Sequence, residues 1–232
     1  MTGLSPAEWQ VVLLSLKVAL VAILATLPVA YALAWLLARR RFPGRVLLDA
    51  LVHLPLVLPP VVTGWLLLLV FGRTGAVGAW LEDTLGITLV FRWTGAALAA
   101  GVMALPLMVR AMRLSIEAVD QRLVGAARTL GASPWHAFVT IVLPLSLPGI
   151  AAGAMLGFAR ALGEFGATIT FASNIVGETR TLPLAIYSDL QLPGAESSVA
   201  RLAIISILLS IAALLASEWL VRRSAGGRAH VF

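Results

Sequence analysis

The sequence has no cysteine, one lysine and little charge of either sign. Only 12% of its 232 residues are charged and 60% are hydrophobic, whereas about 25% of the residues in a typical soluble domain are charged. The absence of cysteine excludes disulfides and cysteine-ligated metal sites. The single lysine, Lys17, lies in an apolar run, and a Walker A loop requires a lysine beside its phosphate cradle. We therefore expect a chain that lies in lipid and has no ATPase site of its own.

Long apolar runs take up most of the chain. A transmembrane helix needs about 20 predominantly apolar residues, and five windows approach or exceed this length: Val11–Ala38, Val46–Phe71, Trp93–Val109, Leu147–Phe171 and Ala203–Val221. They predict an all-α, polytopic membrane helix bundle that forms one transmembrane domain over residues 1–232. A short apolar piece, Leu182–Leu190, lies in the segment between the last two windows and leaves room for a sixth helix.

The distribution of arginine predicts the orientation of the spans. Cytoplasmic loops of membrane proteins carry an excess of lysine and arginine. One alternate set of loops holds Arg39, Arg40, Arg41, Arg45, Arg110, Arg113, Arg122, Arg128, Arg222, Arg223 and Arg228, and the other set holds Arg73, Arg92, Arg180 and Arg201. The first set is expected in the cytoplasm, with the N-terminus outside and the C-terminus inside. The four outer arginines are either solvated or available to steer an anion.

Prolines interrupt the second window. Its stretch LPLVLPPVVTG contains Pro59, Pro60 and Thr63, and it predicts a kinked or broken helix. Backbone groups freed at membrane depth are tolerated only against other protein or a water-filled cavity. These three residues are therefore candidates for a translocation path, and the alternative is an irregularity of packing alone.

The segment of about residues 116–144 follows a helix–turn–helix pattern. Apolar residues recur every three or four positions over Ile116–Leu130, which predicts an amphipathic helix. Gly131 fits the position just beyond its end, and Ser133 with Pro134 fits the N-cap and first position of a second helix that stops at Pro144. Periodicity alone leaves open whether this is only a surface helix pair.

A pair of opposite charges lies inside the fourth window. Arg160 and Glu164 are four residues apart and are expected to share a helix face. Because a charge at the bilayer centre costs about 2.5 to 3.5 kcal/mol on insertion scales, the pair should face the bundle interior. It is either a structural ion pair or part of the path of an anion.

No catalytic or metal site is predicted. The sequence has no H-E-x-x-H or G-x-S-x-G motif and only three histidines. Asp49 and His53 share a helix face near the inner end of the second window, but two ligands are too few for a metal site. We expect these two residues to be paired or solvated.

The run GAARTLGASPWHAFVTIVLP resembles the cytoplasmic EAA loop of binding-protein-dependent ABC permeases. In that family the loop docks into a groove on a separate ATPase. The resemblance assigns ATPase coupling to the residues Gly125, Ala126, Ala127, Gly131, Ser133, Pro134, Trp135, His136, Ile141, Leu143 and Pro144. One position departs from the pattern, because Gly125 stands where the family usually has glutamate.

The section ARALGEFGATITFASNIVGETRTLPLAIY is similar to molybdate permeases. This resemblance implies a MetI-like bundle in a bacterial inner membrane, working as a homodimer with two ATPase subunits and an extracytoplasmic molybdate-binding protein. ATP and Mg²⁺ would be bound by the ATPase, with no cofactor in this chain and no nucleic-acid partner. Tungstate, sulfate or thiosulfate remain alternative substrates, and an ATP-independent anion transporter is the alternative mechanism.

Overall fold

The computed structural model describes the backbone of residues 4–226 and the side chains up to Ala216, and this part of the chain is helical without any strand. Four of its helices are long and apolar enough to cross a membrane, and one bent helix pair would make a fifth. Those four are α1 (Pro6–Arg39), α5 (Trp93–Glu117), the continuous helix Pro134–Leu162, whose last part is α8 (Leu143–Leu162), and α11 (Glu196–Gly226). Arg228 and the side chains of Arg222 and Arg223 lie outside the described part.

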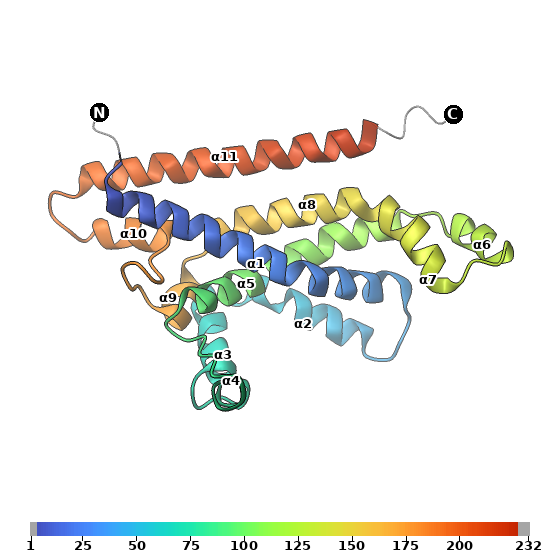
Figure 1. Cartoon of the computed structure of the whole chain (residues 1–232), viewed down its shortest axis with the longest axis horizontal. Coiled ribbons are helices and arrows are strands. Elements are labelled where there is room, and N and C mark those ends of the chain that lie inside the picture. The colour runs from blue at the N-terminus through green and yellow to red at the C-terminus, as the bar shows by residue number, and fades with distance from the viewer. Residues whose placement is uncertain (1–3, 227–232) are drawn as a thin grey trace.

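The helices α1, α5 and α8 form the centre of the bundle, with α11 packed along α8 (Figure 1). Small side chains make this packing close. Gly157 on α8 has no room for a β-carbon, which would lie 2.8 Å from Cγ of Met108 on α5. Buried alanines on α1 and α5 have the same effect, and they include Ala19, Ala22, Ala34, Ala96, Ala100 and Ala104. Small residues at helix contacts are typical of membrane bundles, where they let the backbones approach.

The second window is broken, which confirms the kinked or broken helix predicted from its prolines. It forms α2 (Arg45–Val57) and α3 (Pro60–Phe71), and the chain direction bends by 119° between them. Leu58 has extended backbone with ψ of 144°, the conformation favoured before a proline, and Pro59 has no N–H to continue the helix. From this bend, α3 and α4 (Ala76–Leu85) project away from the bundle (Figure 1).

The fourth span begins and ends earlier in the sequence than the predicted window Leu147–Phe171. A continuous helix crosses from Pro134 to Leu162, formed by α7 (Pro134–Ala137), a π-helix (Phe138–Val142) and α8. It passes through Pro144, so the prediction that the second helix stops there was wrong. In the π-helix the Leu143 N–H bonds to the Phe138 carbonyl, and this wider turn is one way that a helix accommodates an interruption.

After α8 the chain breaks and forms α9 (Gly166–Ala172) and α10 (Leu182–Asp189). The predicted short apolar helix in this segment is confirmed by α10, which at about 12 Å is too short to span a membrane. The predicted amphipathic helix at Ile116–Leu130 is divided, because α5 runs to Glu117 and α6 covers Gln121–Thr129. Asp120 separates them and caps α6 by accepting a hydrogen bond from the Arg122 N–H.

The bundle has two distinct ends (Figure 1). The α6 end carries α6, α7 and the link between α1 and α2, and it holds the arginine-rich loops of the first half of the chain. The α10 end carries α10 and the beginnings of α1 and α11. The loops of the first arginine set that the structure describes therefore share one end of the bundle.

Candidate functional site

The turn between α6 and α7 has the predicted caps. Gly131 has φ of +92°, a left-handed conformation that favours glycine. Its N–H bonds to the Arg128 carbonyl at 3.1 Å, and the Ala132 N–H bonds to the Ala127 carbonyl at 3.0 Å, which completes a Schellman motif. The Ser133 hydroxyl then accepts a hydrogen bond from the His136 N–H at 3.1 Å. Both ends of the turn are thus fixed by local hydrogen bonds.

This turn presents large apolar side chains to its surroundings. Leu130 is 88% exposed and Trp135 is 72% exposed, and no residue of α6 is buried. A shallow hollow beside them is lined by Ala127, Leu130, Gly131, Ala132, Ser133, His136 and Thr140. The charges of Arg122 and Arg128 on the same helix are too costly to place in hydrocarbon. An apolar surface outside lipid is typical of a protein-docking site, and we call the exposed face of α6 and α7 the docking surface.

Aromatic rings connect the docking surface to the centre of the bundle. Trp135 stacks on Phe138 with ring centroids 5.3 Å apart. Phe138 in turn contacts Tyr31 at 6.1 Å and Trp35 at 6.2 Å, both on α1. The Tyr31 hydroxyl lies 3.0 Å from the Ser146 hydroxyl on α8. Trp135 is therefore linked to both α1 and α8 by side chains in contact. Ile141, Leu143 and Pro144 lie on the same continuous helix as Trp135.

The position of Gly125 on α6 is open. A β-carbon placed there would have no atom within 4 Å. The glutamate usual at this point in the family would therefore fit without a clash, and its absence removes a surface carboxylate rather than relieving crowding. Ala126 and Ala127, which follow it, lie on the same exposed helix.

Charged side chains brace the α6 end, and sequence reasoning missed most of these contacts. Arg39 donates to the carbonyl of Ile116 at 2.6 Å, which ties the end of α1 to the end of α5. Arg113 pairs with Asp49 at 3.1 Å, and Asp49 lies 3.3 Å from His53. Asp49 and His53 were expected to be paired or solvated, and the structure has them paired. The described residues contain no group of three or more histidine, cysteine, aspartate or glutamate residues that could hold a metal ion.

The structure brings the two broken helices together. α3 packs on α9, and Gly64 is so close that a β-carbon would lie 2.7 Å from the Ala167 carbonyl oxygen. A β-carbon on Gly166 would lie 2.6 Å from Cβ of Pro60. Thr63 is buried beside them, and its hydroxyl has no hydrogen-bond partner among the described residues. The candidate path residues Pro59, Pro60 and Thr63 therefore lie next to the segment that follows Glu164.

Arg160 and Glu164 form an ion pair, with Nη1 of the arginine 2.6 Å from Oε2 of the glutamate. They do not share a continuous helix face as predicted, because α8 ends at Leu162. The other carboxylate oxygen of Glu164 accepts a hydrogen bond from the Ala167 N–H at 2.8 Å. The Glu164 side chain is 2% exposed and that of Arg160 is 27% exposed. Both oxygens of the glutamate thus bind protein, and the pair holds the end of α8 to the start of α9.

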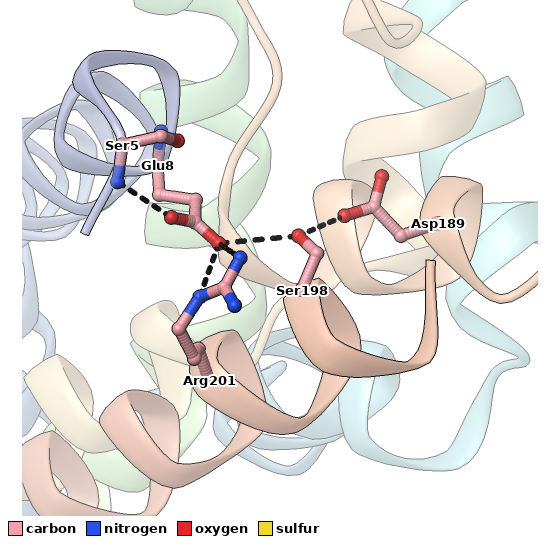
Figure 2. Close-up of polar contacts among 5 residues, drawn as sticks. All are labelled: Ser5, Glu8, Asp189, Ser198 and Arg201. Carbon is pink, nitrogen blue, oxygen red and sulfur yellow. Dashed lines mark hydrogen bonds and ion pairs between the residues drawn. The ribbon is translucent and has the colours of Figure 1, made fainter. Parts of the chain in front are cut away.

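A second cluster joins three helices at the α10 end (Figure 2). Arg201 on α11 donates to Oε1 of Glu8 on α1, with Nη2 at 2.7 Å and Nε at 2.9 Å. The Ser198 hydroxyl lies 2.7 Å from Asp189 of α10 and 3.2 Å from Glu8. Glu8 also completes a capping box with Ser5. Glu8 itself was the sequence signal for this cluster that we missed, because it is a carboxylate in the first turn of a long apolar helix.

The outer arginines are largely engaged within the chain. Arg201 is held by Glu8, and Nε of Arg180 donates to Asn174 at 3.0 Å. Arg73 lies 3.9 Å from Glu82 in an exposed pair. Steering of an anion by these arginines stays a prediction, and among the described residues Arg92 is the one of the four that is exposed without a side-chain pairing.

The chain matches a known family and several curated proteins. The family model of the binding-protein-dependent transport system inner membrane component matches residues 8–226. The molybdenum transport system permease protein of Escherichia coli K12 is 61% identical, over 95% of this chain and 96% of that protein. The sulfate transport system permease protein of the same organism is 40% identical, over 76% of this chain and 65% of that protein.

Solved structures with the same fold are ABC transporters. An alginate ABC transporter in complex with its alginate-bound periplasmic protein matches 94% of this chain and 80% of that chain, with a TM-score of 0.73 and 17% identity. An inward-facing methionine ABC transporter matches 94% of each chain, with a TM-score of 0.67 and 15% identity. At these identities the likeness shows the fold alone.

Proposed function

Because the chain belongs to the family of binding-protein-dependent transport system inner membrane components, we propose that it is the membrane-spanning subunit of an ATP-driven molybdate importer. The observation that supports molybdate as the substrate is the 61% identity to a molybdenum permease over 95% of the chain. The identity to a sulfate permease is 40% over 76% of the chain. The four or five apolar spans agree with a multi-pass protein of a bacterial inner membrane.

The docking surface is where a separate ATPase would bind. It combines an exposed Leu130, an exposed Trp135 and a hollow beside Gly131. Binding and hydrolysis of ATP, with Mg²⁺, take place on the partner. Movement of the docked surface would reach α1 and α8 through Phe138 and Ser146. The α6 end is then cytoplasmic, which places the N-terminus outside and the C-terminus inside, as the arginine distribution predicts.

Two copies of the chain would enclose the path of the anion, because a two-fold pair presents the same surface from both sides of its axis. The broken helices α3 and α9 with Pro59, Pro60 and Thr63 are the proposed lining. An extracytoplasmic molybdate-binding protein would deliver the anion at the α10 end, and two ATPase subunits would bind at the α6 end. ATP binding opens the path outward, and hydrolysis resets it inward.

The test is uptake of molybdate into proteoliposomes that contain this chain, its ATPase and its binding protein, with sulfate as competitor. We expect uptake that requires ATP and resists excess sulfate. Uptake without the ATPase would contradict the mechanism, and strong competition by sulfate would contradict the substrate.

Replacement of Leu130 tests the docking surface directly. Leu130 packs against little of its own chain, being 88% exposed, so Leu130→Asp should leave the fold intact while it weakens ATPase binding and uptake by at least tenfold. The matched control is Leu192→Asp, because Leu192 is also exposed but follows α10 at the other end of the bundle. Equal retention of ATPase in pull-downs of both variants would contradict docking at this surface.

A further inference from the structure

An apolar groove runs between α1 and α5. Val21, Ala25 and Val29 line it from α1, and Thr94, Leu98 and Leu105 line it from α5. These residues extend over about 12 Å of α1 and about 16 Å of α5, at 1.5 Å per helical residue. The groove thus has the length and apolar character of a site for one acyl chain.

The only lysine of the chain lies at one end of this groove. Lys17 precedes Val21 by one helical turn, so both lie on the same face of α1. Its ammonium lies 3.6 Å from the ring centroid of Trp93, the residue next to Thr94. Within the part of the chain that the structure describes, Lys17 has no carboxylate or hydrogen-bond partner. An exposed ammonium over an indole remains able to bind an anion.

Helix lengths place Lys17 at the edge of the hydrocarbon layer. The 22 residues from Lys17 to Arg39 span about 33 Å, close to the roughly 30 Å of a bilayer core. Arg39 bonds to Ile116 at the opposite end of α5, so α1 and α5 cross the layer together. Lysine and tryptophan are typical anchors at this boundary, where lipid phosphates lie.

Beyond Lys17 a second hollow continues toward the N-terminus, lined by Trp9, Gln10, Leu13 and Lys17 among others. Lys17 lines this hollow and lies one helical turn from Val21, which lines the groove, so its ammonium stands between the two as a phosphate stands between a headgroup and an acyl chain. We propose that α1 and α5 bind an anionic phospholipid, whose phosphate contacts Lys17 and one of whose acyl chains fills the groove. This site is separate from the docking surface and from the proposed path of molybdate.

Native mass spectrometry of the full chain tests the charge at the site. The chain is purified from mixed micelles with equal amounts of phosphatidylglycerol and phosphatidylethanolamine, and retained lipids are counted by mass. One basic residue near a membrane surface should favour the anionic lipid about fivefold. Lys17→Gln should remove this preference, whereas Lys17→Arg should keep it. Equal retention of phosphatidylglycerol by the wild type and Lys17→Gln would overturn the proposal.

A second pair of variants tests the groove itself. Ala25 is exposed, so Ala25→Phe fills the groove without crowding the core and should reduce retention of both lipids. Leu24→Phe is the matched control, because Leu24 is 62% exposed on the same helix and does not line the groove. Unchanged lipid retention in Ala25→Phe would overturn the acyl-chain site.

A helix of a second copy is the competing occupant of the groove. Because the chain has no cysteine, Ala25→Cys provides a unique thiol for oxidative cross-linking in membranes. We expect no dimer through this position, since a lipid covers it. An efficient disulfide between two copies would show that protein covers the groove, and it would overturn the proposal.

Discussion

The ion pair between Arg160 and Glu164 gives a sharp test of whether its role is structural. Arg160→Met would leave a charged Glu164 that is 2% exposed, with only the Ala167 N–H as a partner. Removing one partner of a buried pair costs about 3–5 kcal/mol. Glu164→Gln leaves Arg160, which is 27% exposed rather than fully buried, and the amide oxygen can still accept from the Ala167 N–H. We therefore expect a smaller loss of about 2 kcal/mol.

The double variant Arg160→Met with Glu164→Gln contains no unpaired charge. Its loss of unfolding free energy should be about 2 kcal/mol, well below the sum of the two single losses, because neither charge is left alone. The assay is reversible unfolding in mixed micelles, followed by tryptophan fluorescence. Additive losses, or a larger loss from the glutamate variant than from the arginine variant, would refute this account of the pair.

Molybdate uptake by the same variants distinguishes a structural role of the ion pair from a role in transport. Both carboxylate oxygens of Glu164 are already bound within the chain, so the double variant should retain most of the molybdate uptake of the wild type. A double variant that folds with the expected stability but transports nothing would show that Arg160 contacts the anion. The unfolding measurement is the control, because a loss of uptake through instability would appear there first.

Three further predictions follow from the geometry of single residues. Gly131→Val should cost about 1–2 kcal/mol of stability through its left-handed backbone alone, since no atom lies within 4 Å of the added β-carbon; Gly131→Asn should be milder in the same thermal unfolding assay. Gly64→Ala should separate α3 from α9 and cost about 1–3 kcal/mol, whereas Gly163→Ala, with nothing within 4 Å, should be close to neutral. Arg201→Met should cost about 3–5 kcal/mol because Glu8 stays buried, while Arg73→Met, in an exposed pair, should cost at most about 1 kcal/mol.

The sequence predicted local features of the docking surface well. Gly131, Ser133 and Pro134 were assigned to the turn and caps that they form, because capping depends on residues within one helical turn. The break at Ala118–Asp120 was missed, although Asp120 is a good N-cap residue. Its apolar neighbours Ile116 and Val119 continue the helical period, and periodicity does not register a change in the direction of the chain.

Apolar windows determined that the chain is a membrane helix bundle, but they did not determine its helix boundaries. Hydropathy is the same for a straight span and for two helices with a bend of 119° between them. It also does not determine where a span begins and ends within the apolar run from Pro134 to Phe171. Proline at Pro59 indicated a break, whereas proline at Pro144 was accommodated by the π-helix. Whether a proline breaks a helix depends on the backbone conformation of the turns beside it, and the presence of a proline in the sequence does not determine that conformation.

The sequence by itself determined the class of the protein as a membrane helix bundle and the position of the turn at Gly131, because these depend on composition, spacing and local caps. Only the tertiary structure decided which charges meet. Glu8 and Arg201 are 193 residues apart in the chain, and α3 meets α9 through glycines whose importance is not apparent from their spacing. Long-range pairing depends on how whole helices pack, and packing is a property of all the buried side chains together rather than of any one segment.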